Sequence, residues 1–125
     1  MTRLTAAQIG VSVILSALGQ IILKAGVATP SVQAAAQSGS LPGFVLAVAT
    51  SVLVWVGLVV YGLSVLLWLG VLARIEVSTA YPFVALGMIL TCALGYFVYG
   101  ESMSAAKAGG ILLIASGVIL VARSA

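Results

Sequence analysis

The spacing of charged residues constrains this chain more than any other feature of its sequence. Seven side chains are charged, and they leave charge-free intervals at positions 4–23, 25–73, 77–100 and 108–122. The charged residues are Arg3, Lys24, Arg74, Glu76, Glu101, Lys107 and Arg123. A helix that crosses the hydrocarbon core of a bilayer, ~30 Å thick, needs about 20 mostly apolar residues. We therefore expect one membrane-spanning helix in each of the first, third and fourth intervals.

The second interval is too long for one helix and contains its own breaks. The segments Thr29-Pro30-Ser31 and Gln37–Gly43 hold Pro, Gly and Ser, which end helices and form loops. A single span is expected after them, and Ser31–Gln37 is expected to form a short helical turn outside the membrane. The four predicted spans are Ala6–Ala28, Phe44–Ala73, Ser78–Tyr99 and Ala105–Ala122. The second would be roughly 45 Å long and should tilt or project from the bilayer at its Phe44 end.

Composition supports an integral membrane protein. Hydrophobic residues make up 63% of the chain and charged residues 6%, and the mean hydropathy is +1.34, whereas soluble domains carry about 25% charged residues. The apolar runs lack the alternation that a membrane β-barrel requires. The predicted fold is therefore all-α: a single four-helix transmembrane domain over residues 1–125. The first helix is long enough to span, so we interpret it as a retained span rather than a cleaved signal peptide.

The inventory of reactive side chains excludes most enzyme chemistry. The chain has no His, one cysteine (Cys92) and two acidic residues. A His/Cys metal site, a Cys/His or Ser/His/Asp nucleophile and an intramolecular disulfide are therefore not expected. The net charge is +3, but the five cations are dispersed and form no cluster that would bind nucleic acid. We expect no enzyme activity, no cofactor, no metal and no nucleic-acid partner.

The distribution of cations predicts the orientation. Four spans place both termini on one side, where Arg3, Arg74 and Arg123 stand against Lys24 and Lys107 on the other. By the positive-inside rule, the termini are expected in the cytoplasm. Because the two counts are nearly balanced, insertion in both orientations stays open as an alternative.

Polar residues inside the first span indicate either a function or a packing role. Ser12, Ser16, Gln20 and Lys24 follow one another at intervals of four, which places them on one helical face. One interpretation is that this stripe lines a substrate path. The other is that Ser and Gln join helices by hydrogen bonds while Lys24 extends its amine to the membrane surface.

Three further positions, near the ends of the predicted spans, also have polar or charged side chains. Glu101 opens the loop between the third and fourth spans, on the side of Lys24, so the two can pair; otherwise Glu101 is a solvated loop charge beside a helix capped by Ser104. Arg74 borders the inner loop, where it can meet an anionic headgroup or only fix topology. Tyr81 lies at headgroup depth and is typical of an interface anchor.

The fourth span contains glycines at Gly110 and Gly117. Small residues let helix backbones approach closely, so this face is expected to pack against another helix. Because four helices enclose little interior, the neighbour is expected to belong to a second copy or a paralogue. We therefore predict a dimer.

The pattern of the fourth span, Gly110-Ile111-Leu112-Leu113-Ile114-Ala115-Ser116-Gly117-Val118, is similar to the dimerisation pattern G-L-x-L-I-x-x-G-V of the small-multidrug-resistance class. The chain thus resembles the drug/metabolite transporter (EamA-like) superfamily over its whole length. The drug exporters of that class carry a membrane-embedded Glu where this chain has Ser16. The resemblance therefore argues against proton-driven cation export.

A closer resemblance is to the ArnE/ArnF-type subunits that flip undecaprenyl-phosphate-aminoarabinose across the bacterial inner membrane for modification of the lipid A of lipopolysaccharide. The matching elements are Gly19-Gln20 with Lys24, Trp68 ahead of Ala80-Tyr81-Pro82, and the acid Glu101. The resemblance implies a flippase subunit that acts on a polyprenyl-phosphate-linked sugar and contacts membrane lipids. The alternatives are a small-cation or metabolite exporter and a structural subunit.

The flippase hypothesis assigns roles to particular residues. A phosphate in hydrocarbon requires cations and hydrogen-bond donors. The predicted substrate-binding residues are Ser16, Gln20, Lys24, Arg74, Tyr81 and Glu101, and the predicted dimer residues are Gly110 and Gly117.

Overall fold

The computed structural model describes residues 2–124, and helices account for most of them. The elements are α1 (Arg3–Val27), α2 (Pro30–Gln37), α3 (Leu41–Ala49), α4 (Val52–Leu72), α5 (Val77–Ala80), a 3-10 turn (Tyr81–Phe83), α6 (Val84–Tyr99) and α7 (Ala105–Ser124). Four helical stretches are long and apolar enough to cross a membrane: α1, α4, the stretch from α5 to α6, and α7. No strand occurs within the described residues. The predicted all-α, four-span fold is confirmed, and the chain is a multi-pass membrane protein.

The second predicted span differs from the structure. Instead of one helix over Phe44–Ala73, the chain forms α3 and α4, which are separated at Thr50 and Ser51. The Thr50 hydroxyl donates to the Leu46 carbonyl at 2.9 Å, and Ser51 adopts an extended conformation whose Oγ accepts the Val54 N–H. Such local bonds compete with a continuous helix and start a new one. The expectation of one 30-residue helix that tilts or projects from the bilayer was therefore wrong, since α4 alone, with 21 residues, matches the bilayer core.

The third span is interrupted near its start. The 3-10 turn Tyr81–Phe83 separates α5 from α6, because Pro82 has no N–H to donate to the preceding turn. At the other end, Gly100 ends α6 with a φ of 64°, a left-handed conformation that glycine adopts without strain. The predicted span Ser78–Tyr99 thus has the expected extent but consists of three pieces.

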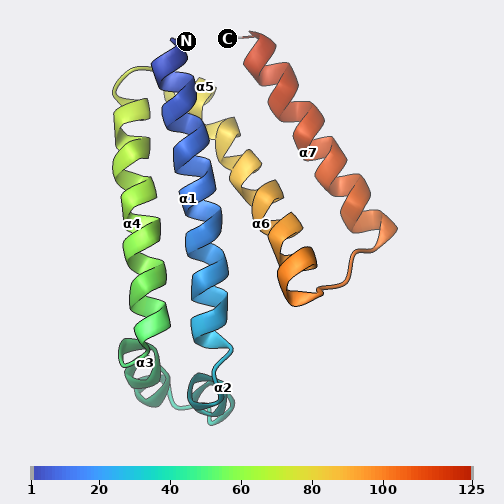
Figure 1. The fold of residues 1–125 in the computed structure, drawn as a ribbon. Coiled ribbons are helices and arrows are strands. Elements are labelled where there is room, and N and C mark those ends of the chain that lie inside the picture. The colour runs from blue at the N-terminus through green and yellow to red at the C-terminus, as the bar shows by residue number, and fades with distance from the viewer. Residues whose placement is uncertain (1, 125) are drawn as a thin grey trace.

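The closest helix packing in the chain joins α1 to α4. Figure 1 shows α1 between α4 on one side and α6 on the other. A Cβ added to Gly26 would lie 2.7 Å from Cγ2 of Val54, and one added to Gly57 would lie 2.8 Å from Cγ of Leu23. Because such distances are shorter than van der Waals contact, only glycine permits this approach. The α1–α4 pair is therefore the most closely packed part of the bundle.

The fourth span lies at the edge of the bundle. Helix α7 contacts α6 and the 3-10 turn more than any other element, and Val118 is its one buried residue. Leu113 is 76% exposed. Both termini lie at the same end of the molecule (Figure 1), as expected for four spans.

Candidate substrate groove

Ser12 has a structural role. Its hydroxyl donates to the Ser64 carbonyl on α4 at 2.8 Å, and both serines are buried. The Ser64 hydroxyl in turn donates to the Tyr61 carbonyl at 2.6 Å. In the absence of water, paired polar groups of this kind join neighbouring helices. The hydrogen-bonding interpretation of the stripe therefore holds for Ser12.

The polar stripe drifts gradually around α1. Four residues of α-helix turn through about 400°, so each step advances the position by roughly 40°. Ser12 faces α4, whereas Ser16 lies against α6, where a Cβ added to Gly87 would be 3.1 Å from its Oγ. Gln20 lies one step further and lines a cavity together with Thr91 of α6. Ser12, Ser16 and Gln20 therefore follow the side of α1 that lines the cavities between α4 and α6, whereas the exposed Lys24 lines neither of these cavities.

Two adjoining cavities lie where α1, α4 and the third span meet. The first has a volume of about 250 Å³ and is lined by Ser12, Val13, Ser16, Tyr61, Ser64, Val65, Trp68, Tyr81 and Val84. The second has about 340 Å³ and is lined by Ser16, Gln20, Tyr61, Val84, Gly87, Met88, Thr91 and Cys92. Because they share Ser16, Tyr61 and Val84, we treat the two cavities as one feature, here called the groove.

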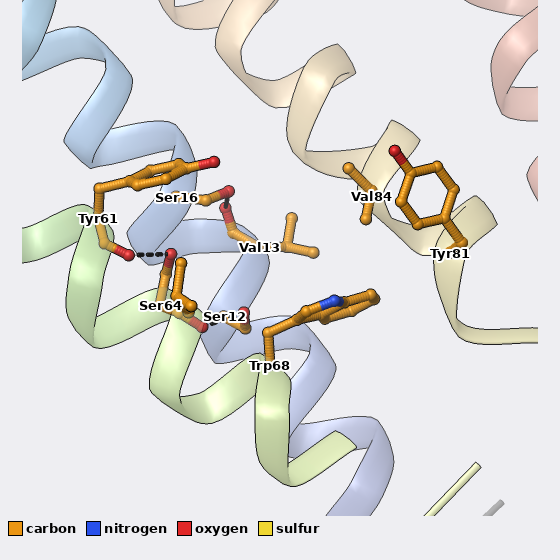
Figure 2. A pocket seen from close by; sticks show the side chains of 9 residues that line it. Ser12, Val13, Ser16, Tyr61, Ser64, Trp68, Tyr81 and Val84 are labelled. Carbon is orange, nitrogen blue, oxygen red and sulfur yellow. Dashed lines mark hydrogen bonds between the residues drawn. The ribbon is translucent and has the colours of Figure 1, made fainter. Parts of the chain in front are cut away.

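The groove presents aromatic hydrogen-bond donors. Figure 2 shows Tyr61 and Trp68 projecting from α4, with Tyr81 across the cavity from them. None of these three side chains is hydrogen-bonded to another residue drawn there, whereas the Ser16 hydroxyl donates to the Val13 carbonyl at 3.0 Å. None of the lining residues of the groove is charged. The groove therefore offers neutral donors and aromatic faces to a ligand.

At the end of the bundle that holds the termini, Arg74 makes a contact with α1. Its guanidinium donates to Oε1 of Gln8, and a Cβ added to Gly70 would lie 3.1 Å from Nε2 of the same Gln8. A cavity of about 470 Å³ beside Arg74 is lined also by Thr2 and Thr5. Because Gln8 is neutral, this hydrogen bond positions the Arg74 guanidinium without neutralising its charge.

At the opposite end of α1, Lys24 and Glu101 are both exposed. The structure does not bring them together: the Glu101 carboxylate folds against α6, where a Cβ added to Gly95 would lie 2.5 Å from its Oε2. The Tyr99 hydroxyl instead donates to the Ile21 carbonyl at 2.7 Å and ties α6 to α1. The prediction of Ser104 as a helix cap is confirmed, since its Oγ accepts the Lys107 N–H.

Three residues of this region were not assigned to a site from the sequence. Gln8 positions Arg74, and Tyr61 and Trp68 line the groove. Gln8 stands four residues before Ser12 and extends the polar stripe by one step. Tyr61 and Trp68 are seven residues apart with Ser64 between them, which places them on one helical face. This spacing was a usable signal, although it does not indicate which neighbour the face meets.

Within residues 2–124, no other element packs closely against Gly110 or Gly117. A Cβ added to either would meet no atom within 4 Å. Their place in a dimer stays a prediction.

Several known relatives of the chain share one name. The probable 4-amino-4-deoxy-L-arabinose-phosphoundecaprenol flippase subunit ArnE of Pseudomonas aeruginosa is 42% identical over 71 residues, which cover 57% of this chain and 62% of that protein. The protein of the same name from Pseudomonas syringae pv. syringae is 32% identical over 112 residues, which cover 90% of this chain and 94% of that protein. The chain belongs to the ArnE family.

A third ArnE relative, from Pseudomonas savastanoi pv. phaseolicola, is 37% identical over 86 residues, covering 69% of this chain and 75% of that protein. The ArnE resemblance inferred from the motifs is therefore confirmed. The shared name describes a transporter subunit and not an enzyme. No family model matches the chain, and no solved structure matches it.

Proposed function

We propose that this chain is a subunit of a flippase that moves a polyprenyl-phosphate-linked sugar of the aminoarabinose type across the bacterial inner membrane. The observation that carries the proposal is the uncharged groove with Tyr61, Trp68 and Tyr81 along it. Helices α4 and α6 both pack on α1, so α1 forms the floor of the groove. Tyr61, Tyr81 and Cys92 are exposed, so the groove opens sideways, where lipid lies.

The groove suits a polar headgroup whose tail remains in the membrane. A substrate carrying a long isoprenoid chain can slide its sugar along such a groove while the tail stays among lipid acyl chains. Hydroxyls of the sugar can pair with Tyr61, Tyr81, Gln20 and, after rotation of its hydroxyl, Ser16. A cationic sugar amine can lie on the face of Trp68.

The phosphate requires positive charge, which lies at the two ends of the path. Arg74 is held by Gln8 at the end with the termini, and Lys24 lies exposed at the other end of α1. Burying a phosphate without cations or hydrogen-bond donors is prohibitively costly, so between the two cations the donors of Gln20, Tyr61 and Tyr81 in the groove would have to stabilise it. The proposed sequence is binding at Arg74, passage of the headgroup along the groove, and release near Lys24, with Glu101 at that same outer end.

The proposed orientation places both termini in the cytoplasm, where the lipid-linked sugar would be accepted. The proposed functional unit is a dimer, of identical chains or with a paralogue, that uses Gly110 and Gly117 of α7. A Thr2→Cys label in a Cys92→Ser background tests the orientation, because modification from the periplasmic side of intact cells would contradict it.

A small-cation or metabolite exporter is the second candidate, favoured by the aromatic side chains of the groove. No carboxylate lines the groove, however, and Ser16 is one of its lining residues. We therefore expect no export of quaternary ammonium compounds that depends on a pH gradient. Proteoliposomes that hold the chain, with and without a paralogue, should translocate a labelled polyprenyl-phosphate aminosugar and not a quaternary ammonium ion. The reverse result would establish the exporter, and no transport of either would leave a structural subunit.

The single cysteine allows a test of the groove itself. Cys92 lines the groove and is exposed, so a membrane-permeant maleimide should modify it. A polyprenyl-phosphate aminosugar should slow this modification several-fold. The matched control is Cys92→Ser with Ser116→Cys, which moves the thiol to an exposed position on α7 and should give no protection. Equal protection at both positions, or at neither, would contradict binding in the groove.

A further inference from the structure

We propose that α3 is embedded in the lipid of the membrane interface, with the face formed by Leu41, Val45 and Leu46 in contact with acyl chains. Figure 1 shows α2 and α3 lying across the ends of α1 and α4 instead of continuing them. All nine residues of α3 are apolar or glycine, and none is buried. The exposed fractions of Leu41, Val45 and Leu46 are 72%, 57% and 66%. At about 100° per residue, Leu41 and Val45 lie about 40° apart around the helix, and Leu46 lies about 100° beyond Val45, so these three make up a broad apolar side of α3.

The carbonyl end of α3 is paired in a way that lipid requires and water does not. The last four carbonyls of a helix have no partner within it, and they pair with side chains, with a tightened last turn or with water. The Thr50 hydroxyl donates to the Leu46 carbonyl at 2.9 Å and to the Ala47 carbonyl at 3.1 Å. The Thr50 backbone N–H also donates to the Leu46 carbonyl, at 3.1 Å, so Thr50 alone pairs two of the four carbonyls.

The two remaining carbonyls are covered as well. The Ser51 N–H donates to the Val48 carbonyl at 3.1 Å, and the Trp55 indole N–H donates to the Ala49 carbonyl at 2.6 Å. All four terminal carbonyls of α3 are therefore paired within the chain. An unpaired carbonyl costs several kcal/mol in hydrocarbon, whereas in water the same pairing would gain little.

Most backbone N–H groups at the amino end of α3 are also paired within the chain. Pro42 has no N–H, the Gly43 N–H donates to Ser40 Oγ at 3.2 Å, and the Phe44 N–H donates to the Ser40 carbonyl at 3.0 Å. The charge-free interval 25–73 contains the whole segment, so placing α3 in lipid buries no charge. These observations together favour lipid over water as the surroundings of the exposed face.

Helices α2 and α3 form a helical hairpin, and α2 differs from α3 in its polarity. It packs against α3 but carries Gln33 and Gln37, both exposed, and Gln33 Nε2 caps α1 by donating to the Val27 carbonyl at 2.7 Å. The polar helix is therefore suited to water or headgroups and the apolar helix to acyl chains. The hairpin is expected to lie at the boundary between the two.

The test uses the full chain in vesicles of phosphatidylethanolamine and phosphatidylglycerol. In a Cys92→Ser background, a nitroxide label is placed at Val45→Cys or Leu46→Cys, with Gln37→Cys on α2 as the matched control. Collision with oxygen, which concentrates in lipid, is compared with collision with a water-soluble nickel chelate. The oxygen-to-nickel ratio is expected to be several-fold higher at positions 45 and 46 than at 37.

Two outcomes would overturn the proposal. A ratio at positions 45 and 46 equal to that at 37 would place α3 in water. Low collision rates with both reagents would show that protein, such as a second copy, covers the face. Because both labelled positions are exposed, the label itself is not expected to disturb folding, and agreement between the two positions guards against a local effect. The result does not depend on the proposed transport activity.

Discussion

The α1–α4 pair and α7 use glycine in opposite ways. In the pair, Gly26 and Gly57 stand so close to the opposite helix that a Cβ would clash at 2.7 Å and 2.8 Å. On α7, a Cβ added to Gly110 or Gly117 would meet nothing within 4 Å. The difference shows that glycine in a membrane helix does not by itself identify a packed face. Some glycines allow helices to pack closely inside the bundle, and others lie on its outer surface without a close neighbour.

The largest expected effect breaks the close pair. Gly26→Leu forces a side chain against Val54, including its backbone N at 2.9 Å, and backbone cannot move aside cheaply. Overpacking costs about 1–3 kcal/mol or more, a large part of a typical folding free energy of about 5–15 kcal/mol. The melting temperature in detergent, followed by size-exclusion chromatography, should fall sharply. Gly109→Leu on α7, which has open space, is the matched control and should melt like the wild type.

The second prediction concerns the open face of α7. Replacing both Gly110 and Gly117 with Leu should abolish the dimer while leaving insertion and the fold of the single chain intact, because bulky residues block close approach of a partner helix. The mass of the protein–detergent complex, measured by light scattering, should correspond to one chain. If the double variant stays dimeric, the dimer is held by another surface.

The third prediction compares the cations of the two regions. Lys24→Ala on α1 should reduce transport of the lipid-linked sugar by about tenfold or more, since a hydrogen bond to a charged group contributes about 1.5–3 kcal/mol. Arg123→Ala at the end of α7, near the C-terminus, should reduce it little. Initial rates in proteoliposomes provide the measurement. Equal, mild effects would return Lys24 to the role of a membrane-surface anchor.

The smallest expected effect is a difference in stability between two serine-to-alanine variants. Ser12→Ala removes a buried bond of 2.8 Å between α1 and α4, whereas Ser116→Ala removes only an exposed bond to the Leu112 carbonyl of its own helix. Hydrogen bonds between membrane helices contribute about 0.6 kcal/mol on average. Unfolding in mixed micelles should show a loss of that order for Ser12→Ala and a smaller loss for Ser116→Ala. A larger loss for Ser116→Ala would mean that α7 is more tightly packed than α1.

The amino-acid sequence by itself determined the number and type of the spans. Crossing a bilayer imposes a length and an apolar composition on each helix, and both can be counted along the chain. The charges at Lys24, Arg74 and Glu101 therefore mark the ends of spans in the structure as they do in the sequence. Four matches in order also indicated the ArnE family: Gly19-Gln20 with Lys24, Trp68, Ala80-Tyr81-Pro82 and Glu101.

The tertiary structure alone decided which side chains meet. A rotation of roughly 40° per four residues sends Ser12 to α4 and Ser16 to α6, and no local pattern states where the neighbouring helices stand. The break at Thr50 was likewise hidden, because it depends on the extended backbone of Ser51, whose Oγ caps α4, and the apolar run around it does not indicate this conformation. Tyr61 became a groove residue only through α1 and α6, which lie far from it in the chain. Contacts of this kind depend on the relative placement of whole helices, which is determined by many residues of several helices together.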